Sequence, residues 1–400
     1  MDMKSPKEAG SGLWDWADYL EAMKPIGAQV LATTQHPNNP QDRQETWRLM
    51  MATLAQAYQQ LVYADPNYPE FVPVYSTILN LSAPNPDYLY RSAEINGSGI
   101  YRLRGKRGTN RFTLVSLHAG YFGLGNARPN TGEHDLDELN IAPDGTFSVI
   151  LSKARPAGYT GDWWYLDPDT TLVGNRIAGY DWATEQDSQI GIERLDVPSS
   201  APRLSAEEID RRLKLMITWL TNHPKLGYDR IADLAKKGPA NTLEIFDYTS
   251  VGGAKGQVYV EGMFDLQPDE GLLLEAKVPD VCKYWSFLVT DEQFVTIDWM
   301  QHQSSLNGFQ AQIDKDGHVR IVISPSDPGV PNWLDTGGYQ RGAIQVRWNN
   351  CSAAPNPVAT KVKLADLRRH IPADTPVVSP AERETVLRER RWAAQMRRRW

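Results

Sequence analysis

Apolar residues return at helical spacing in three parts of the chain. Large apolar side chains recur every three or four positions between residues 13 and 61, which predicts N-terminal helices. Ser205 and Glu208 form a capping box before a second amphipathic stretch, which we expect to end at Pro224. A third helix is expected after residue 379. These stretches predict a helical cap, a helical connector and a C-terminal helix.

Between the helical regions, the periodicity changes to short strands that are separated by turn residues. One strand-rich block runs from residue 75 to about residue 195, and another runs from about residue 257 to residue 348. Short alternating runs bounded by Gly, Pro, Asn and Asp are typical of strands. Because the strands come in runs with the helices set apart, we expect antiparallel sheets.

The two strand-rich blocks share an order of landmarks. Each has an Asp-Gly turn before a strand, then a tryptophan, then an arginine at nearly equal spacing. These landmarks are Asp144-Gly145, Trp163 and Arg176 in the first block, and Asp316-Gly317, Trp333 and Arg347 in the second. Duplicated β units usually pack face to face, so we expect a cleft lined by aromatic rings where the two blocks meet.

The predicted fold class is α+β, mainly antiparallel β, with two related units of the β-sandwich or jelly-roll type. In chain order, the expected divisions are a helical cap (12–74), a first β unit (75–200), a helical connector (201–256), a second β unit (257–352) and a C-terminal arm with an Arg-rich helix (353–400).

Composition and charge narrow the function. A net charge of -7 argues against nucleic acid as the main partner, because a phosphate-binding surface normally leaves a basic excess. No run approaches the roughly 20 apolar residues of a membrane helix, and the first residues lack the apolar stretch of a secretory signal. Cys282 and Cys351 could form a disulfide, but a chain of this size does not need one. We therefore expect reduced thiols in the cytoplasm.

Aromatic residues with a polar atom are abundant: 13 Trp and 17 Tyr exceed 9 Phe. Such rings suit either the core and rim of a sandwich or a ring-lined cavity. The C-terminal helix combines many arginines with Trp392, Met396 and Trp400 at every fourth position. It could bind acidic lipid or nucleic acid, or it could dock on the body of the protein or on a second subunit of a homo-oligomer.

Two candidate segments lie in the first β unit. In an extended segment, Tyr88 and Tyr90 point to one face and Arg91 to the other. A tyrosine can act as a general acid or base, and an arginine can bind a carboxylate or phenolate. His118 and Tyr121 follow a predicted strand, where the imidazole could line the mouth of a cavity. Each residue could equally serve the fold.

A third candidate segment crowds polar groups behind an apolar strand. It contains Asp298, Trp299, His302 and Asn307, which could together supply an acid, a base, a ring contact and hydrogen bonds. We expect this segment and His118 to meet in one pocket.

A fourth segment is a loop stiffened by prolines and glycines, and it carries Asn332, Trp333 and Asp335. Its tryptophan has a counterpart in the first block and could serve the fold. Asn332 and Asp335 lack such counterparts, so they are the better functional candidates. In an enzyme, the rings of Trp299 and Trp333 would hold the apolar body of the substrate.

Familiar catalytic motifs are absent from the sequence. It has no Gly-x-Ser-x-Gly elbow, no phosphate-binding loop, no dinucleotide fingerprint after a strand and no His-Glu-x-x-His. Its seven histidines are scattered singly, so we expect neither a metal nor an organic cofactor.

Several motifs resemble a known family. The segments Asn85-Pro86-Asp87-Tyr88-Leu89-Tyr90, 99–105 and 176–182, with the Asp-Gly strand and its Trp loop, are similar to the bacterial domain-of-unknown-function family numbered 1214. The resemblance covers about residues 12–350. It implies an antiparallel β-sandwich protein, often from bacteria that degrade steroids, lignin-derived aromatics or other apolar compounds. It therefore implies a small, mostly apolar substrate, and it assigns no catalytic residue.

The sequence predicts a cofactor-independent acid/base enzyme of the lyase, dehydratase or isomerase type, including retro-aldol carbon–carbon cleavage. The expected substrate is a hydrophobic aromatic or steroid-like molecule in a catabolic pathway. Tyr90, His118, Asp298 and His302 would move protons. The alternative is a non-catalytic sandwich that binds carbohydrate or lipid through exposed rings, and a third possibility is an assembly role for the C-terminal helix.

Overall fold

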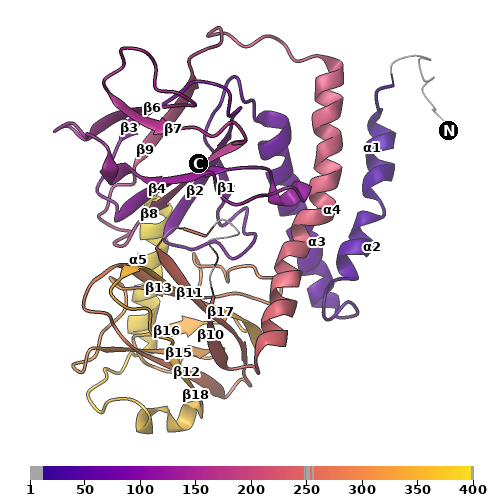
Figure 1. Ribbon diagram of the computed structural model, residues 1–400. Coiled ribbons are helices and arrows are strands. Elements are labelled where there is room, and N and C mark those ends of the chain that lie inside the picture. Colours follow the sequence, from indigo (N-terminus) through magenta and orange to yellow (C-terminus); the bar gives the residue numbers. More distant parts are fainter. Residues whose placement is uncertain (1–11, 247, 249–252, 255, 398–400) are drawn as a thin grey trace.

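The computed structural model describes residues 12–246, 248, 253–254 and 256–397. Figure 1 shows two β-rich bodies with helices running along one side of both. The first half contains α1 (Trp16–Met23), α2 (Ile26–Leu31), α3 (Pro40–Ala57), the π-helical turn η1 (Tyr58–Tyr63), β1 (Val72–Tyr75), β2 (Tyr88–Glu94), β3 (Tyr101–Lys106), β4 (Phe112–His118), η2 (Phe122–Leu124), β5 (Gly132–Asp135), η3 (Leu136–Glu138), β6 (Thr146–Ser152), β7 (Asp162–Tyr165), β8 (Leu172–Ala178) and β9 (Gln189–Arg194).

The second half begins with the longest described helix and ends with another helix. It contains α4 (Ala206–Lys237), β10 (Thr242–Phe246), β11 (Gln257–Asp265), β12 (Glu270–Lys277), β13 (Cys282–Val289), β14 (Ser305–Asn307), β15 (His318–Ser324), β16 (Trp333–Asp335), β17 (Arg341–Cys351), β18 (Val358–Lys363), η5 (Leu364–Arg369) and α5 (Pro380–Met396). The predicted α+β class, with mostly antiparallel strands and helices at both ends and in the middle, is confirmed.

The two β units have the same topology. The first consists of the sheets β1-β2-β8-β4-β5 and β7-β6-β3-β9, and the second of β10-β11-β17-β13-β14 and β16-β15-β12-β18. Adding nine to each strand number of the first unit gives the second, and the parallel pair β6–β7 recurs as β15–β16. Each unit buries its own apolar core between its two sheets. The duplication expected from the sequence is therefore present strand by strand.

The shared landmarks occupy equivalent places. Gly145 and Gly317 have φ of +81° and +75°, a conformation that glycine adopts without steric cost, and each precedes the equivalent strand β6 or β15. The indole of Trp163 donates to the hydroxyl of Ser152, and that of Trp333 donates to a backbone oxygen at the matching position. The repeated tryptophans therefore fasten β7 and β16 to their neighbouring strands.

The units pack through the outer faces of their five-stranded sheets. By strand register, Tyr88 is equivalent to Gln257 and Phe112 to Tyr284. Tyr88 donates to the Gln257 side chain at 3.1 Å, and the rings of Phe112 and Tyr284 meet edge to face at 5.7 Å. Contacts between equivalent residues are typical of a two-fold arrangement. These side chains are buried and fill the junction, so the prediction of a hollow between the two units is wrong.

Helix α4 runs past both units (Figure 1). It begins after the N-cap Ser205, as predicted, but it continues through Pro224 to Lys237, so the predicted end was wrong. A proline inside a helix costs about 3 kcal/mol. Burial on both sides of Pro224 offsets this cost: Trp219 packs near the first unit, and Ile231 packs against the second.

Helix α5 joins the two units within one chain. Arg383 bonds to the second unit through Asp327, whereas Arg397, near the other end, bonds to the first unit through Asp187 at 2.6 Å. The stripe does not dock on the body of the protein, because Trp392 and Met396 are 58% and 61% exposed. Trp400 lies outside the described residues. The helix is thus a clamp on its own body, held by arginines rather than by its aromatic stripe.

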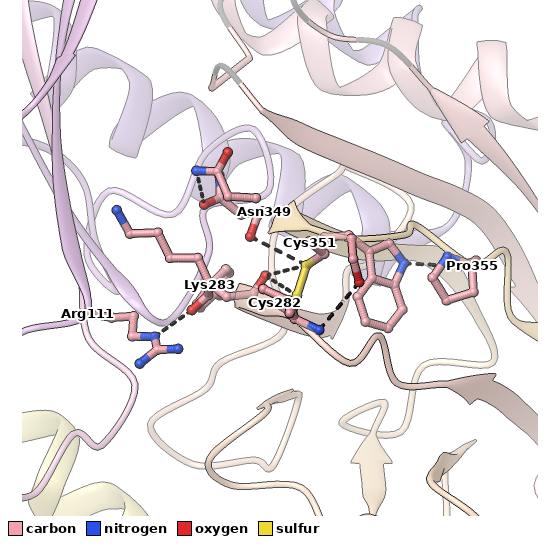
Figure 2. The surroundings of a disulfide bond; sticks show 11 residues. Arg111, Cys282, Lys283, Asn349, Cys351 and Pro355 are labelled. Atoms are coloured by element: carbon pink, nitrogen blue, oxygen red, sulfur yellow. Dashed lines mark hydrogen bonds between the residues drawn. A yellow bond between two sulfur atoms is a disulfide. The ribbon is translucent and has the colours of Figure 1, made fainter.

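The two cysteines meet in a disulfide, so the expectation of reduced thiols is wrong. Cys282 on β13 and Cys351 on β17 are directly paired in the antiparallel register. Figure 2 shows this bridge beside the junction of the units, where Arg111 donates to the backbone oxygen of Lys283. Among the described residues, no helix combines the length and apolar character needed to cross a membrane.

Candidate functional site

A mainly apolar cavity of about 140 Å³ lies on the outer face of the first five-stranded sheet, beyond the junction. The sheet supplies its floor, α3 with η1 and α4 cover it, and the segment after β4 forms one wall. The aromatic side chains that line it are those of Tyr75, Tyr90, Tyr121, Phe122 and Trp219.

Comparison of the two units explains why the cavity exists. Three neighbouring positions on β2, β4 and β8 carry small side chains that face the helices. They are Ser92, Ser116 and Gly174, and the register of the second unit places Glu261, Leu288 and Gln345 at the equivalent positions. In the second unit, Gln345 donates to Glu261, and both are buried. Large side chains of the second unit therefore fill the space that stays open in the first unit.

His118, predicted from its place at a strand end, borders this cavity. A Cβ atom on Gly174 would lie 3.0 Å from Nε2 of His118, so the imidazole lies over the bare backbone of β8. Burial, helped by the positive charge of Arg176, lowers the pKa of His118 to about 4. The imidazole is therefore neutral at neutral pH, because the charged form loses hydration and meets a like charge.

Arg176 supplies the positive charge on the sheet side of the cavity. It is equivalent to Arg347 in the second unit and donates to the hydroxyl of Ser116 at 2.7 Å. Tyr90 pairs with it across β2 and β8, and the ring of Tyr90 meets that of Tyr75 edge to face at 5.5 Å. Burial raises the pKa of Tyr90 to about 12, although nearby arginines oppose this shift. Both tyrosines are therefore protonated at neutral pH and can donate hydrogen bonds.

A carboxyl group beside the cavity titrates near neutrality. The hydroxyl of Tyr121, a predicted site residue, donates to Glu94 at 2.8 Å. Burial raises the pKa of Glu94 to about 7, against the opposing effect of the Tyr121 hydrogen bond. Perturbed carboxyl groups of this kind are common at functional sites. The sequence analysis missed Glu94. Its only signal was that it lies four residues after Tyr90 in the same strand and therefore on the same face.

Two buried polar atoms at the helical side of the cavity have no hydrogen-bond partner among the described residues. They are Oε1 of Gln56 on α3 and Nε1 of Trp219 on α4. Because buried polar atoms are normally satisfied, an acceptor and a donor left open beside one cavity suit a bound polar molecule. Both residues lie in ordinary amphipathic stretches, so nothing in the sequence singled them out.

Arg91 also borders this cavity, and its strand position is on the face opposite to Tyr90, as alternation predicted. Burial lowers the pKa of Arg91. Tyr88, the other tyrosine of this candidate segment, lies instead in the filled junction and donates to Gln257.

The third and fourth predicted segments contribute to a different cavity, of about 380 Å³, beside the second unit. Asp298 and His302 line it, whereas His118 does not. The expectation that His118 and His302 share one pocket is therefore wrong. The two cavities nevertheless lie at related places. The first borders the loop after β4, and the second borders the loop after β13, which is the equivalent strand of the second unit. Asp335 approaches Nδ1 of His302 at 2.7 Å.

The remaining predicted residues hold the fold. Trp299 is buried against the clamp helix α5. Asn307 donates to the buried Asp87 at 2.8 Å and so ties the second unit to the first. Asn332 bridges two backbone segments, and Trp333 lies under the guanidinium of Arg383 at 5.1 Å. None of these four borders either of the two cavities.

Comparisons with known proteins agree with the expected resemblance. Residues 266–348 match DUF1214, a family described as protein of unknown function, so the resemblance is confirmed for that segment of the second unit. The motifs quoted from the first unit lie outside the match. No curated protein matches the chain.

Two solved structures are similar to this chain. An uncharacterised protein from Burkholderia cenocepacia has 29% sequence identity and a TM-score of 0.81, over 88% of this chain and 97% of its own. The VPA0106 protein from Vibrio parahaemolyticus has 13% identity and a TM-score of 0.45, over 86% of this chain and 99% of its own.

Proposed function

We propose that the first cavity is the active site of a cofactor-independent acid/base enzyme of the lyase, dehydratase or isomerase type, with retro-aldol cleavage among the possible reactions. The observation that carries this proposal is the internal comparison. One copy of a duplicated sheet has small residues where the other has large ones, and a neutral imidazole, an arginine and open hydrogen-bonding atoms surround the resulting space.

In this proposal, His118 takes a proton from the substrate. Its low pKa keeps the imidazole unprotonated at neutral pH, and it makes the imidazolium a strong acid that returns the proton to another atom of the same molecule. Arg176 stabilises the negative charge that develops on a substrate oxygen when the proton leaves. Tyr90 donates a hydrogen bond to the same oxygen function. The proton thus starts and ends on the substrate, and no external oxidant or reductant is needed.

The cavity size favours a small substrate. A cavity of about 140 Å³ is close to the engineered cavity of roughly 150 Å³ that binds benzene. Drug-sized ligands typically occupy about 300–1,000 Å³. Of the substrates expected from the sequence, a single aromatic ring with an oxygen function fits better than a steroid-like molecule.

The placement of the rings supports catalysis over the binding of carbohydrate or lipid by exposed aromatics. Tyr75, Tyr90 and Trp219 line a recessed space between the sheet and the helices. A binding surface of the alternative type would need such rings in an exposed row.

Proton exchange on a generic substrate tests the proposal. Acetophenone, a single ring with a ketone, would be incubated with the protein in D₂O, and the loss of its methyl protons would be followed by NMR. We expect exchange to be catalysed, and His118→Gln to slow it by about 10²–10⁴-fold. His318→Gln, at the surface of the second unit, is the matched control. Equal rates for the wild type and His118→Gln would refute the role of His118.

Location and assembly are separate proposals. The cytoplasmic location stays a prediction, although a disulfide is more typical of an oxidising compartment. Thiol labelling of Cys282 and Cys351 in intact cells tests it, because labelling before reduction would indicate a reducing compartment. A homo-oligomer through α5 also stays a proposal. Its test is the mass in solution after deletion of residues 379–400, and an unchanged oligomeric state would contradict it.

A further inference from the structure

The larger cavity, beside the second unit, has a different character from the first. It measures about 380 Å³, and α3, residues 77–80, the connection from β13 to β14 and the segment after β16 enclose it. Ionisable side chains line it: Glu45, Arg48, Asp291, Asp298 and His302. Its volume lies within the range of about 300–1,000 Å³ that is usual for small-molecule sites.

The imidazole of His302 is held in a fixed orientation. Its Nδ1 is 2.7 Å from Oδ2 of Asp335, whose other oxygen accepts the backbone N–H of Gly337 at 2.7 Å. With Nδ1–H donated to this carboxylate, Nε2 of the neutral ring accepts a hydrogen bond. The hydrogen bond to Asp335 raises the pKa of His302, and in the protonated ring Nε2–H donates instead. Gly337 has φ of +62°, and a Cβ there would lie 3.7 Å from Nε2. The absent side chain leaves the Nε2 edge of the ring uncovered.

The buried carboxyl group of Asp291 faces the same space, and burial raises its pKa to about 7. Asp291 is 4% exposed, and its Oδ1 accepts the backbone N–H groups of Gln293 and Val295 at 2.8 and 3.0 Å. Within the described part of the chain, no hydrogen bond reaches its Oδ2. A second open acceptor is the buried Oδ1 of Asn80, whose Nδ2 is held by a backbone oxygen. Polar groups from three separate segments therefore keep hydrogen-bonding capacity for a ligand.

Hydrogen-bonding character decides between ligand classes. An ammonium group would satisfy these acceptors and would be attracted by the acidic side chains of the lining, but it has no acceptor to offer the guanidinium of Arg48, which lies in the same lining. A hydroxyl group both donates and accepts, so it can pair with Asp291, Asn80 or His302 and also with the guanidinium of Arg48. An apolar ligand would leave all of these groups unpaired, at a cost of about 1–3 kcal/mol each.

We propose that this cavity is a second ligand site, which binds a small hydroxyl-rich molecule of the sugar or polyol class. His302, held by Asp335, and Asp291 form hydrogen bonds with the hydroxyl groups, which can donate or accept, and Arg48 donates to them. The site is independent of the first cavity and of its proton chemistry.

Binding of maltose to the full-length protein tests this proposal, by saturation-transfer NMR followed by calorimetry. We expect the wild type to bind maltose, and His302→Gln and Asp291→Asn each to weaken the affinity by about tenfold, the effect of one lost hydrogen bond of about 1.4 kcal/mol. His318→Gln, outside the cavity, should bind as the wild type does. Thermal unfolding checks that each variant is folded.

Three outcomes would overturn the assignment. They are no maltose signal with the wild type, equal affinities for the wild type and both variants, and binding of putrescine but not maltose. The last outcome would make the cavity an amine site. Because His302→Gln is nearly isosteric, it keeps the test valid if Asp291→Asn does not fold.

Discussion

Gly174 leaves open in the first unit the space that Gln345 fills at the equivalent position of the second unit. Replacing Gly174 by glutamine is therefore the sharpest perturbation of the first cavity. In Gly174→Gln, the new Cβ alone would lie 3.0 Å from Nε2 and 3.3 Å from Cδ2 of His118. The longer side chain must then enter the cavity. Backbone strain does not arise, because Gly174 lies inside the regular strand β8.

The magnitude follows from ligand linkage. A ligand at 100 times its Kd stabilises the folded state by about 2.7 kcal/mol. At about 2.1 cal/mol/K per residue, the 400 residues give an unfolding entropy of roughly 0.84 kcal/mol/K, so acetophenone should raise the Tm of the wild type by about 3 °C. Without ligand, Gly174→Gln should change stability by less than about 1 kcal/mol, because the gain from replacing a strand glycine offsets the pressure on His118.

The assay is thermal unfolding of each protein with and without acetophenone. Gly191→Gln is the matched control, since Gly191 is an exposed strand glycine where a Cβ would find its nearest neighbour at 3.8 Å. We expect the control to keep the ligand-induced shift and Gly174→Gln to lose it. A full shift in Gly174→Gln would mean that the ligand binds elsewhere, and the account of the first cavity would be wrong.

Four further predictions concern stability. Burial lowers the pKa of His223 to about 4, so the folded state should lose about 3 kcal/mol of its free energy of unfolding as pH falls from about 6.5 to 4. In denaturant titrations, His223→Phe should lack this loss. Glu94, with its pKa raised from 4.5 to about 7, should destabilise the fold as pH rises through that range, and Glu94→Gln should be more stable than the wild type above pH 7. Replacing Cys282 and Cys351 by serine should cost up to about 4 kcal/mol, from the sequence separation of 69 residues, and equal stability of the variant and the oxidised wild type would contradict the bridge. Arg397→Ala should cost about 3 kcal/mol because it leaves a carboxylate of the first unit without its partner, and a loss below 1 kcal/mol in urea unfolding would argue against the clamp.

The sequence predicted those features that depend on local pattern. The Asp-Gly turns, Trp163 with Trp333, and Arg176 with Arg347 identified the duplication because turn, ring and charge recur at nearly constant spacing. The course of α4 could not be predicted in the same way. Whether a helix continues through Pro224 depends on burial against two units that are distant in the sequence.

The candidate sites could be predicted only in part, because local pattern shows which residues are polar but not which segments meet. Polar density and strand ends pointed to Tyr90, His118 and His302, and all three border cavities. Whether space stays open on the outer face of the sheet depends on which side chains become neighbours across β2, β4 and β8. These strands are far apart in the sequence, so no local pattern predicts their pairing. A single glycine in β8 and an indole in α4 look ordinary in the sequence, although both shape the first cavity. The disulfide likewise depends on the register between β13 and β17.

The most direct test of the central claim is a crystal structure of the protein soaked with 4-bromophenol, with the bromine located by anomalous scattering. The account predicts a bromine peak among Tyr75, Trp219 and Phe122, with the phenolic oxygen directed toward Arg176 and His118. A peak in the second cavity or on the surface, with the first cavity empty of ligand, would contradict it.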